Sequence, residues 1–212
     1  VFGYLNEVLE LLKSDLKCSA KSPEEFIDLH KIDEALKVNV CYQVFVTAQQ
    51  IKKSKASKDE KMNTIFATDI VKMSRTHTKY IQFKLFMDLI EQKSISANIK
   101  VQLSYLCALI GITHLEEDCR ACYEVGYFGP KSSQLLTDSI KLLLTKIRPQ
   151  IIPLAESFGF PDSYLVSAIG NSYGDIYETH LKWAQESKLN QQKGGIPVGF
   201  MENIMPIVQG KL

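Results

Sequence analysis

Three basic side chains lie close together near the middle of the chain, in the segment Arg75-Thr76-His77-Thr78-Lys79. Guanidinium, imidazolium and ammonium groups bind phosphate and carboxylate oxygens through charge-assisted hydrogen bonds. We therefore name Arg75, His77 and Lys79 as candidates for contact with an anion, from either a cofactor or a partner chain. The alternative is that the three side chains belong to a hydrogen-bond network inside a helical bundle.

Two cysteines form a Cys-x-x-Cys pair, Cys119 and Cys122, and His114 precedes them. A zinc site would need a fourth ligand at a recognisable spacing, and a thioredoxin-like motif would follow a strand. This pair instead lies in the helical run LEEDCRACYEV. We interpret both residues as structural thiols and predict no metal site.

Other catalytic motifs are missing from the sequence. It contains no Gly-rich phosphate loop, no nucleophile elbow, no H-E-x-x-H and no acidic metal cluster. The five cysteines are odd in number and scattered, which favours a reducing compartment over a disulfide framework. We assign no catalytic residue.

The composition is that of a soluble protein with a substantial core. Of 212 residues, 45% are hydrophobic and 23% are charged, and the net charge is +1. This balance gives no electrostatic signature of nucleic-acid or anionic-membrane binding. No segment approaches the roughly 18 apolar residues that span a bilayer. Because the chain begins with Val1, we expect it to be the C-terminal piece of a longer protein.

The rest of the chain is predicted to pack around a helix over residues 59–92. Large apolar residues recur in this stretch at the spacing of one helix face, and a second apolar line widens that face toward the C-terminal end. A helix that is apolar nearly all round is buried, so we expect this end to lie inside a bundle. The two lines are Met62, Phe66, Ile70, Met73, Tyr80, Phe83, Phe86 or Met87 and Ile90, and Ile65, Val71, Ile81, Leu85 and Leu89.

A second long helix is predicted to begin at Ser22-Pro23-Glu24-Glu25, where Ser22 accepts from the first-turn amides and Glu25 closes a capping box. It continues to about Ile51. A solvated lysine-rich loop, residues 52–61, then leads into the central helix, so the two should form an antiparallel hairpin.

The remaining segments also favour helices over strands. None shows sustained two-residue alternation between turn signals, which predicts an all-α helical bundle. An amphipathic entry covers residues 1–16. Later helices are expected over residues 95–110 with Gly111 as the stop, 115–128, 132–148, 151–158, 162–169 with Asp162 as the cap, and 175–187.

A recognisable motif lies near the C-terminus, Ser167-Ala168-Ile169-Gly170 followed by NSYGDIYETHLKWAQESKLN. It resembles the closing motif of peroxisomal acyl-CoA oxidases. Upstream, RTHTKYIQFKLFMDLI resembles the His-containing helix of that family, LCALIGI the next helix, and FGYLN the entry into its C-terminal region. The matching residues in the motif are Gly170, Tyr173, Gly174, Asp175, Tyr177, Glu178, Trp183, Ala184, Leu189 and Asn190.

The resemblance implies a bundle of the acyl-CoA oxidase C-terminal type over residues 1–190 and an irregular tail over residues 191–212. It implies a homodimeric FAD enzyme that converts fatty acyl-CoA to trans-2-enoyl-CoA and reduces molecular oxygen to hydrogen peroxide. FAD and the catalytic glutamate of the family belong mainly to the region upstream of this match. We therefore expect this chain alone to be inactive. The alternative is a non-catalytic helical dimerisation or interaction module of an inactive paralogue.

The chain ends in Gly210-Lys211-Leu212. This tripeptide keeps the small, basic and aliphatic order of the peroxisomal signal Ser-Lys-Leu, which an import receptor reads on a free end. Pro197 and Pro206 are expected to keep the preceding segment out of any helix. Together with the family resemblance, the ending predicts a peroxisomal location.

Overall fold

The computed structural model describes residues 3–92, 94–191, 196 and 199–210. It divides into two compact units, Val1–Ile151 and Ile152–Leu212. The described residues form helices and no strand, so the predicted all-α class is confirmed. The boundary predicted between residues 190 and 191 falls inside the second unit and stays a prediction.

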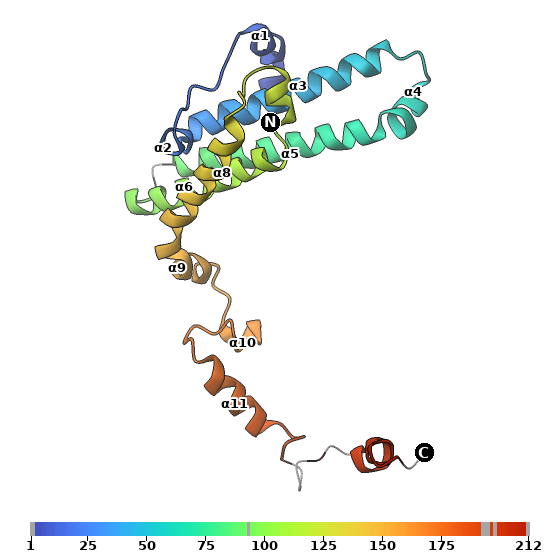
Figure 1. Ribbon diagram of the computed structural model, residues 1–212. Helices are drawn as coiled ribbons and strands as arrows, with labels where there is room; N and C mark the ends of the chain where they lie inside the picture. Colours follow the sequence, from blue (N-terminus) through green and yellow to red (C-terminus); the bar gives the residue numbers. More distant parts are fainter. Residues whose placement is uncertain (1–2, 93, 192–195, 197–198, 211–212) are drawn as a thin grey trace. The chain divides into compact units, whose positions relative to one another are not determined.

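The first unit is a helical bundle. Its helix α6 packs against α3, α5 and α8, while α3 also packs against α1, α5 and α7, and α2 against α8. In Figure 1, α3 and α5 run side by side as the predicted hairpin, and α4 lies at the far end of the pair. The elements are η1 (Gly3–Glu7), α1 (Val8–Lys13), α2 (Pro23–Phe26), α3 (Leu29–Lys53), α4 (Lys58–Glu60), η2 (Lys61–Ile65), α5 (Ala67–Ile90), α6 (Ala97–Glu117), α7 (Arg120–Glu124), α8 (Ser132–Ile147) and η3 (Arg148–Gln150).

The helix predicted from Pro23 to about Ile51 is two helices, α2 and α3. Ser22 caps α2 as predicted, accepting from the Glu25 amide at 3.4 Å, but the Glu25 carboxylate reaches the amide of Lys21 at 2.9 Å. The chain then breaks because the Asp28 carboxylate accepts from the amides of His30 and Lys31 and starts a new helix. Local side-chain competition therefore overrides the continuous apolar pattern.

The predicted central helix is interrupted near its start. Residues Lys61–Ile65 form a π-helical turn, closed by a bond from the Phe66 amide to the Lys61 carbonyl at 3.0 Å. Helix α5 follows without a break to Ile90. The solvated loop is shorter than predicted, because Ser57 and Glu60 form a capping box that starts α4.

The prediction that α5 is buried nearly all round at its C-terminal end is wrong for this structure. Tyr80, Phe83 and Met87 are buried, but Leu85 is 60% and Leu89 46% exposed. Helix α5 buries the face that meets its main neighbours, α3 and α6. Leu85 and Leu89, at the C-terminal end of its second apolar line, are left largely uncovered.

The prediction that Gly111 ends a helix is wrong. Helix α6 runs through it to Glu117, and the glycine is buried. A Cβ added to Gly111 would lie 2.5 Å from Ile32 Cγ2 and 2.7 Å from Phe83 Cδ2. Glycine is therefore required here by the close approach of α3 and α5 to α6.

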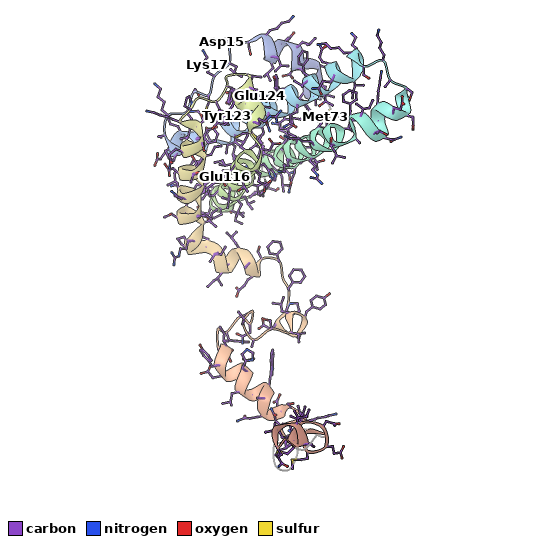
Figure 2. All side chains as sticks on the ribbon, turned by 45° about the vertical axis from the view of Figure 1, so that its right-hand side comes forward. Asp15, Lys17, Met73, Glu116, Tyr123 and Glu124 are labelled. Carbon is purple, nitrogen blue, oxygen red and sulfur yellow. The ribbon has the colours of Figure 1, made fainter. Side chains whose placement is uncertain are left out.

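The helix predicted over residues 115–128 is also corrected. Asp118 leaves α6 in an extended conformation, the short helix α7 follows, and Gly126 adopts a φ of 74°. In Figure 2, Tyr123 and Glu124 mark α7. Helix α8 agrees with the prediction over residues 132–148, and a 3-10 turn that contains Pro149 follows it.

The second unit contains short helices: α9 (Ile151–Glu156), which begins at the last residue of the first unit, α10 (Asp162–Leu165), α11 (Ile176–Glu186), η4 (Phe200–Ile204) and α12 (Met205–Val208). Helix α10 is shorter than predicted. Asp162 does not cap it, because its carboxylate accepts from the amide and hydroxyl of Ser172. The tail is not wholly irregular, since Pro206 lies in the first turn of α12, where proline is tolerated.

Candidate anion-binding pocket

The three candidate cations do not share one face of α5. Arg75 and Lys79 are one turn apart and border the same pocket, together with Lys72. His77 lies on another side of the helix, where its Nδ1 is 2.7 Å from the Tyr4 hydroxyl and the two rings stack. Burial raises the pKa of Tyr4 to about 12 and lowers the pKa of His77. The pair therefore supports the alternative of an internal network for His77.

The pocket has a volume of about 590 Å³ and is bordered by three parts of the first unit. Helix α3 contributes Leu36 and Asn39, and α5 contributes the apolar Ala67 and Val71 together with polar and charged side chains. His114 and Asp118 close the third side from the end of α6. Pockets of roughly 300–1,000 Å³ hold small-molecule ligands in many proteins.

Two of the three cations at the pocket are paired with carboxylates. Lys72 Nζ lies 3.4 Å from the Asp118 carboxylate, and Lys79 pairs with Glu117, whose pKa this hydrogen bond lowers. Arg75 is exposed and forms no ion pair with any side chain that the structure describes. Its guanidinium is the uncompensated positive charge of the pocket.

A polar network fixes the base of the pocket. The Asn39 amide donates to the Asp118 carbonyl at 2.7 Å, and Gln43 donates to the Asp118 carboxylate at 3.3 Å. The Thr76 hydroxyl donates in turn to Gln43 at 2.9 Å. These bonds link α3 to α5 and to the end of α6. They therefore fix the relative positions of the three walls of the pocket.

His114 borders the pocket without a hydrogen bond. Neither ring nitrogen finds a partner among the described residues, and both are shielded from solvent. Burial, and then the charge of Lys79, lowers the pKa of His114. The imidazole is therefore neutral at neutral pH and adds no charge to the pocket.

We expect His114 to make the protein less stable in mild acid. Below the unfolded pKa of about 6.5, the unfolded chain binds a proton that the folded chain resists, so stability falls as pH decreases toward the lower folded pKa. His114→Gln removes this site. Urea unfolding at pH 7.5 and 5.5 should show a smaller loss in the variant than in the wild type. Equal losses would contradict the proposed burial.

The Cys119–Cys122 pair lies at the start of α7. Cys119 precedes α7, and the buried Cys122 thiol faces the Ala35 carbonyl at 3.4 Å. Burial raises the pKa of both thiols. Within the part of the chain that the structure describes, no group of His, Cys, Asp or Glu side chains could hold a metal ion.

Sequence reasoning found Arg75 and Lys79 but missed the other polar residues of the pocket. Lys72 had a usable signal, because it lies three residues before Arg75 and so on the same helix face. Asn39, His114 and Asp118 come from segments far apart in the sequence. Only the tertiary fold brings them together.

Comparison with known proteins places the chain in a family. A family model described as acyl-CoA oxidase matches residues 28–209. The chain belongs to the acyl-CoA oxidase family. Peroxisomal acyl-coenzyme A oxidase 1 of Arabidopsis thaliana is 23% identical over 99% of this chain and 31% of its own length. The protein of the same name from Bos taurus is 28% identical over 80% of this chain and 25% of its own length.

Solved structures of acyl-CoA oxidases share the fold. Acyl-CoA oxidase 1 of Arabidopsis thaliana matches with a TM-score of 0.87 and 22% identity, over 100% of this chain and 31% of that chain. Acyl-CoA oxidase-1 of Caenorhabditis elegans, complexed with FAD and ATP, matches with a TM-score of 0.75 and 23% identity, over 98% of this chain and 34% of that chain. The chain thus spans about a quarter to a third of the length of these relatives. Among its described residues, no helix is long and apolar enough to cross a membrane.

Proposed function

We propose that this chain is the C-terminal portion of an FAD-dependent acyl-CoA oxidase that acts in peroxisomal fatty acid β-oxidation. The observation that carries the proposal is the family match over residues 28–209. The substrate would be a fatty acyl-CoA and the products trans-2-enoyl-CoA and hydrogen peroxide. The active protein would be a homodimer.

The reaction needs groups that we do not assign to this chain. A carboxylate base must remove the α-proton of the thioester, while hydrogen bonds stabilise the negative charge that develops on its carbonyl oxygen. FAD, when bound to the complete protein, would supply the acceptor for the hydride of the β-carbon and the means to reduce oxygen. In the family, the base lies upstream of the region that this chain resembles. The contribution of this chain would therefore be structural, through the packed helical bundle of its first unit.

The pocket at Arg75 does not fit FAD. A flavin dinucleotide carries two phosphate groups, whereas the pocket offers one uncompensated cation, beside the carboxylates of Asp118 and Glu117. We therefore derive no step of flavin chemistry from these residues. FAD would be bound mainly by the part of the protein that this chain does not contain.

The proposal predicts a clear difference between the isolated chain and a complete oxidase polypeptide. Residues 1–212 alone should release no peroxide above background from a fatty acyl-CoA, because we find in them neither a base nor a flavin cradle. The complete polypeptide should bind flavin and release peroxide. The two measurements are the visible absorbance spectrum and a peroxide-coupled assay.

The outcomes of this experiment are distinct. Peroxide formation by residues 1–212 alone would contradict our assignment of no catalytic residue. A colourless, inactive complete polypeptide would favour the non-catalytic interaction module instead.

We propose a peroxisomal location, supported by the names of the relatives and by the Gly210-Lys211-Leu212 ending. Lys211 and Leu212 lie outside the described residues, while Gly210 follows α12 with a φ of 64°. The proposal requires that the tripeptide be presented at a free carboxyl end, which is what the import receptor reads.

A reporter that carries residues 196–212 should enter peroxisomes, and deletion of Leu212 should leave it in the cytosol. Fluorescence microscopy against a peroxisomal marker measures both. A reporter ending in Ser-Lys-Leu serves as the positive control. Equal import with and without Leu212 would show that this tail is not the signal.

A further inference from the structure

We propose that the pocket bordered by Leu36, Val71, Arg75 and His114 binds a small organic molecule with one negative charge and an apolar body, such as a medium-chain carboxylate. The anion would contact the Arg75 guanidinium. The apolar body would lie against α3 and α5.

The enclosure of the pocket supports a small-molecule ligand. Its residues come from α3, from α5 and from the end of α6, so a ligand would be surrounded on three sides. A neighbouring hollow of about 420 Å³ shares Val71, Arg75 and Lys79, but all of its residues belong to α5. One helix cannot surround a ligand. We therefore place the ligand in the three-sided pocket.

The charges of the pocket select a monoanion. Asp118 and Glu117 already compensate Lys72 and Lys79, which leaves the positive charge of Arg75. A polyanion such as a triphosphate would bring extra negative charges close to two carboxylates, and like charges repel. A single carboxylate would instead match the planar fork of one guanidinium through two parallel hydrogen bonds.

The walls of the pocket select an apolar body. Leu36 is buried at its base, and Ala67 and Val71 line the α5 side. Val71 is 50% exposed in this structure, so a ligand that covers it would remove apolar surface from water. The combination of an apolar wall and one guanidinium is typical of a site for an amphipathic acid.

The test uses octanoate as the probe and isothermal titration calorimetry of the intact protein. Octanoate should bind, and Arg75→Gln should weaken binding by about tenfold or more, because a charge-assisted pair is lost. Arg148→Gln is the matched control, since Arg148 is an exposed arginine at the end of α8, away from the pocket residues. It should leave the affinity unchanged.

A second variant tests the apolar wall. Val71→Asp places a carboxylate where the apolar body would lie and should abolish octanoate binding. Val71 is half exposed, so the thermal midpoint of the variant should stay near that of the wild type. Neutral 1-octanol and inorganic triphosphate complete the comparison, and both should bind at least tenfold more weakly than octanoate.

Several results would overturn the proposal. Absence of octanoate binding at millimolar concentration, or equal affinity in Arg75→Gln and the wild type, would exclude this site. Triphosphate binding that equals or exceeds octanoate binding and depends on Arg75 would assign the pocket to polyanions. None of these results bears on the peroxide assay, so the proposed oxidase function is tested separately.

Discussion

Phe83→Ala should lower the free energy of unfolding by about 3–5 kcal/mol. The Phe83 side chain is fully buried at the contact between α5 and α6, and its ring edge lies against Gly111. Alanine would remove the ring and leave a cavity, because the surrounding helices can move only partly into the space. Urea unfolding of residues 1–212, followed by far-UV circular dichroism, measures the change.

Leu85 gives a matched control on the same helix. It lies two residues further along α5 and is 60% exposed, so Leu85→Ala should cost less than about 1 kcal/mol. A loss below about 1 kcal/mol for Phe83→Ala would place that ring on the surface. Equal losses for the two variants would contradict the one-sided burial of α5.

Gly111→Ala should cost about 1–3 kcal/mol through overpacking. The new methyl group would lie 2.5 Å from Ile32 Cγ2 and 2.7 Å from the Phe83 ring, well inside van der Waals contact. Both side chains are fully buried and cannot rotate away. Alanine also favours the helix by about 1 kcal/mol, so a net loss would show that the clash dominates.

Two further variants isolate the cause of this loss. Gly129→Ala adds a methyl group with no atom within 4 Å and should change stability little. In the Gly111→Ala background, Phe83→Leu should cost less than it does in the wild type, because the smaller side chain gives room. A Gly111→Ala protein as stable as the wild type would mean that α6 is not so close to α3 and α5.

Local signals predicted the helices well where neighbours in sequence decide the structure. Ser22 and Pro23 start α2 as expected, and α8 occupies the predicted residues. Errors arose where a local signal had two meanings. Glycine is typical both of a helix end and of a close helix contact, and only the distances from Gly111 to Ile32 and Phe83 distinguish them.

The burial of side chains on α5 depends on which helices pack against it, and the local sequence pattern does not identify those helices. The pattern of Leu85 and Leu89 is as apolar as that of Phe83, yet α3 and α6 cover only one side. A helix face that is apolar but uncovered in this chain is consistent with a longer protein. The periodicity therefore identified apolar faces correctly but could not say what covers each of them.

The candidate site was predicted only in part for the same reason. Arg75 and Lys79 were found because they are one helical turn apart. The position of His77 against Tyr4 depends on a contact across 73 residues, and the Asn39 bond to Asp118 on one across 79. No local pattern encodes such pairs. The family resemblance came instead from short sequence stretches in both units, including Tyr173 and Tyr177 of the second unit, which are exposed in this chain.

The second unit has little core of its own, and this has a consequence for calorimetry of the chain. Of its described residues, only Ala168 is buried, while Tyr164, Val166, Ile169, Tyr173 and Tyr177 are 75–86% exposed. The heat-capacity change of unfolding follows the apolar surface that becomes hydrated, at about 12–15 cal/mol/K per residue of a packed domain. The described residues of the second unit already expose most of their apolar surface to water in the folded chain. The heat-capacity change of unfolding of this chain should therefore equal that of a protein the size of its first unit. Its expected value is about 1.8–2.3 kcal/mol/K, instead of the roughly 2.5–3.2 kcal/mol/K that the full length suggests.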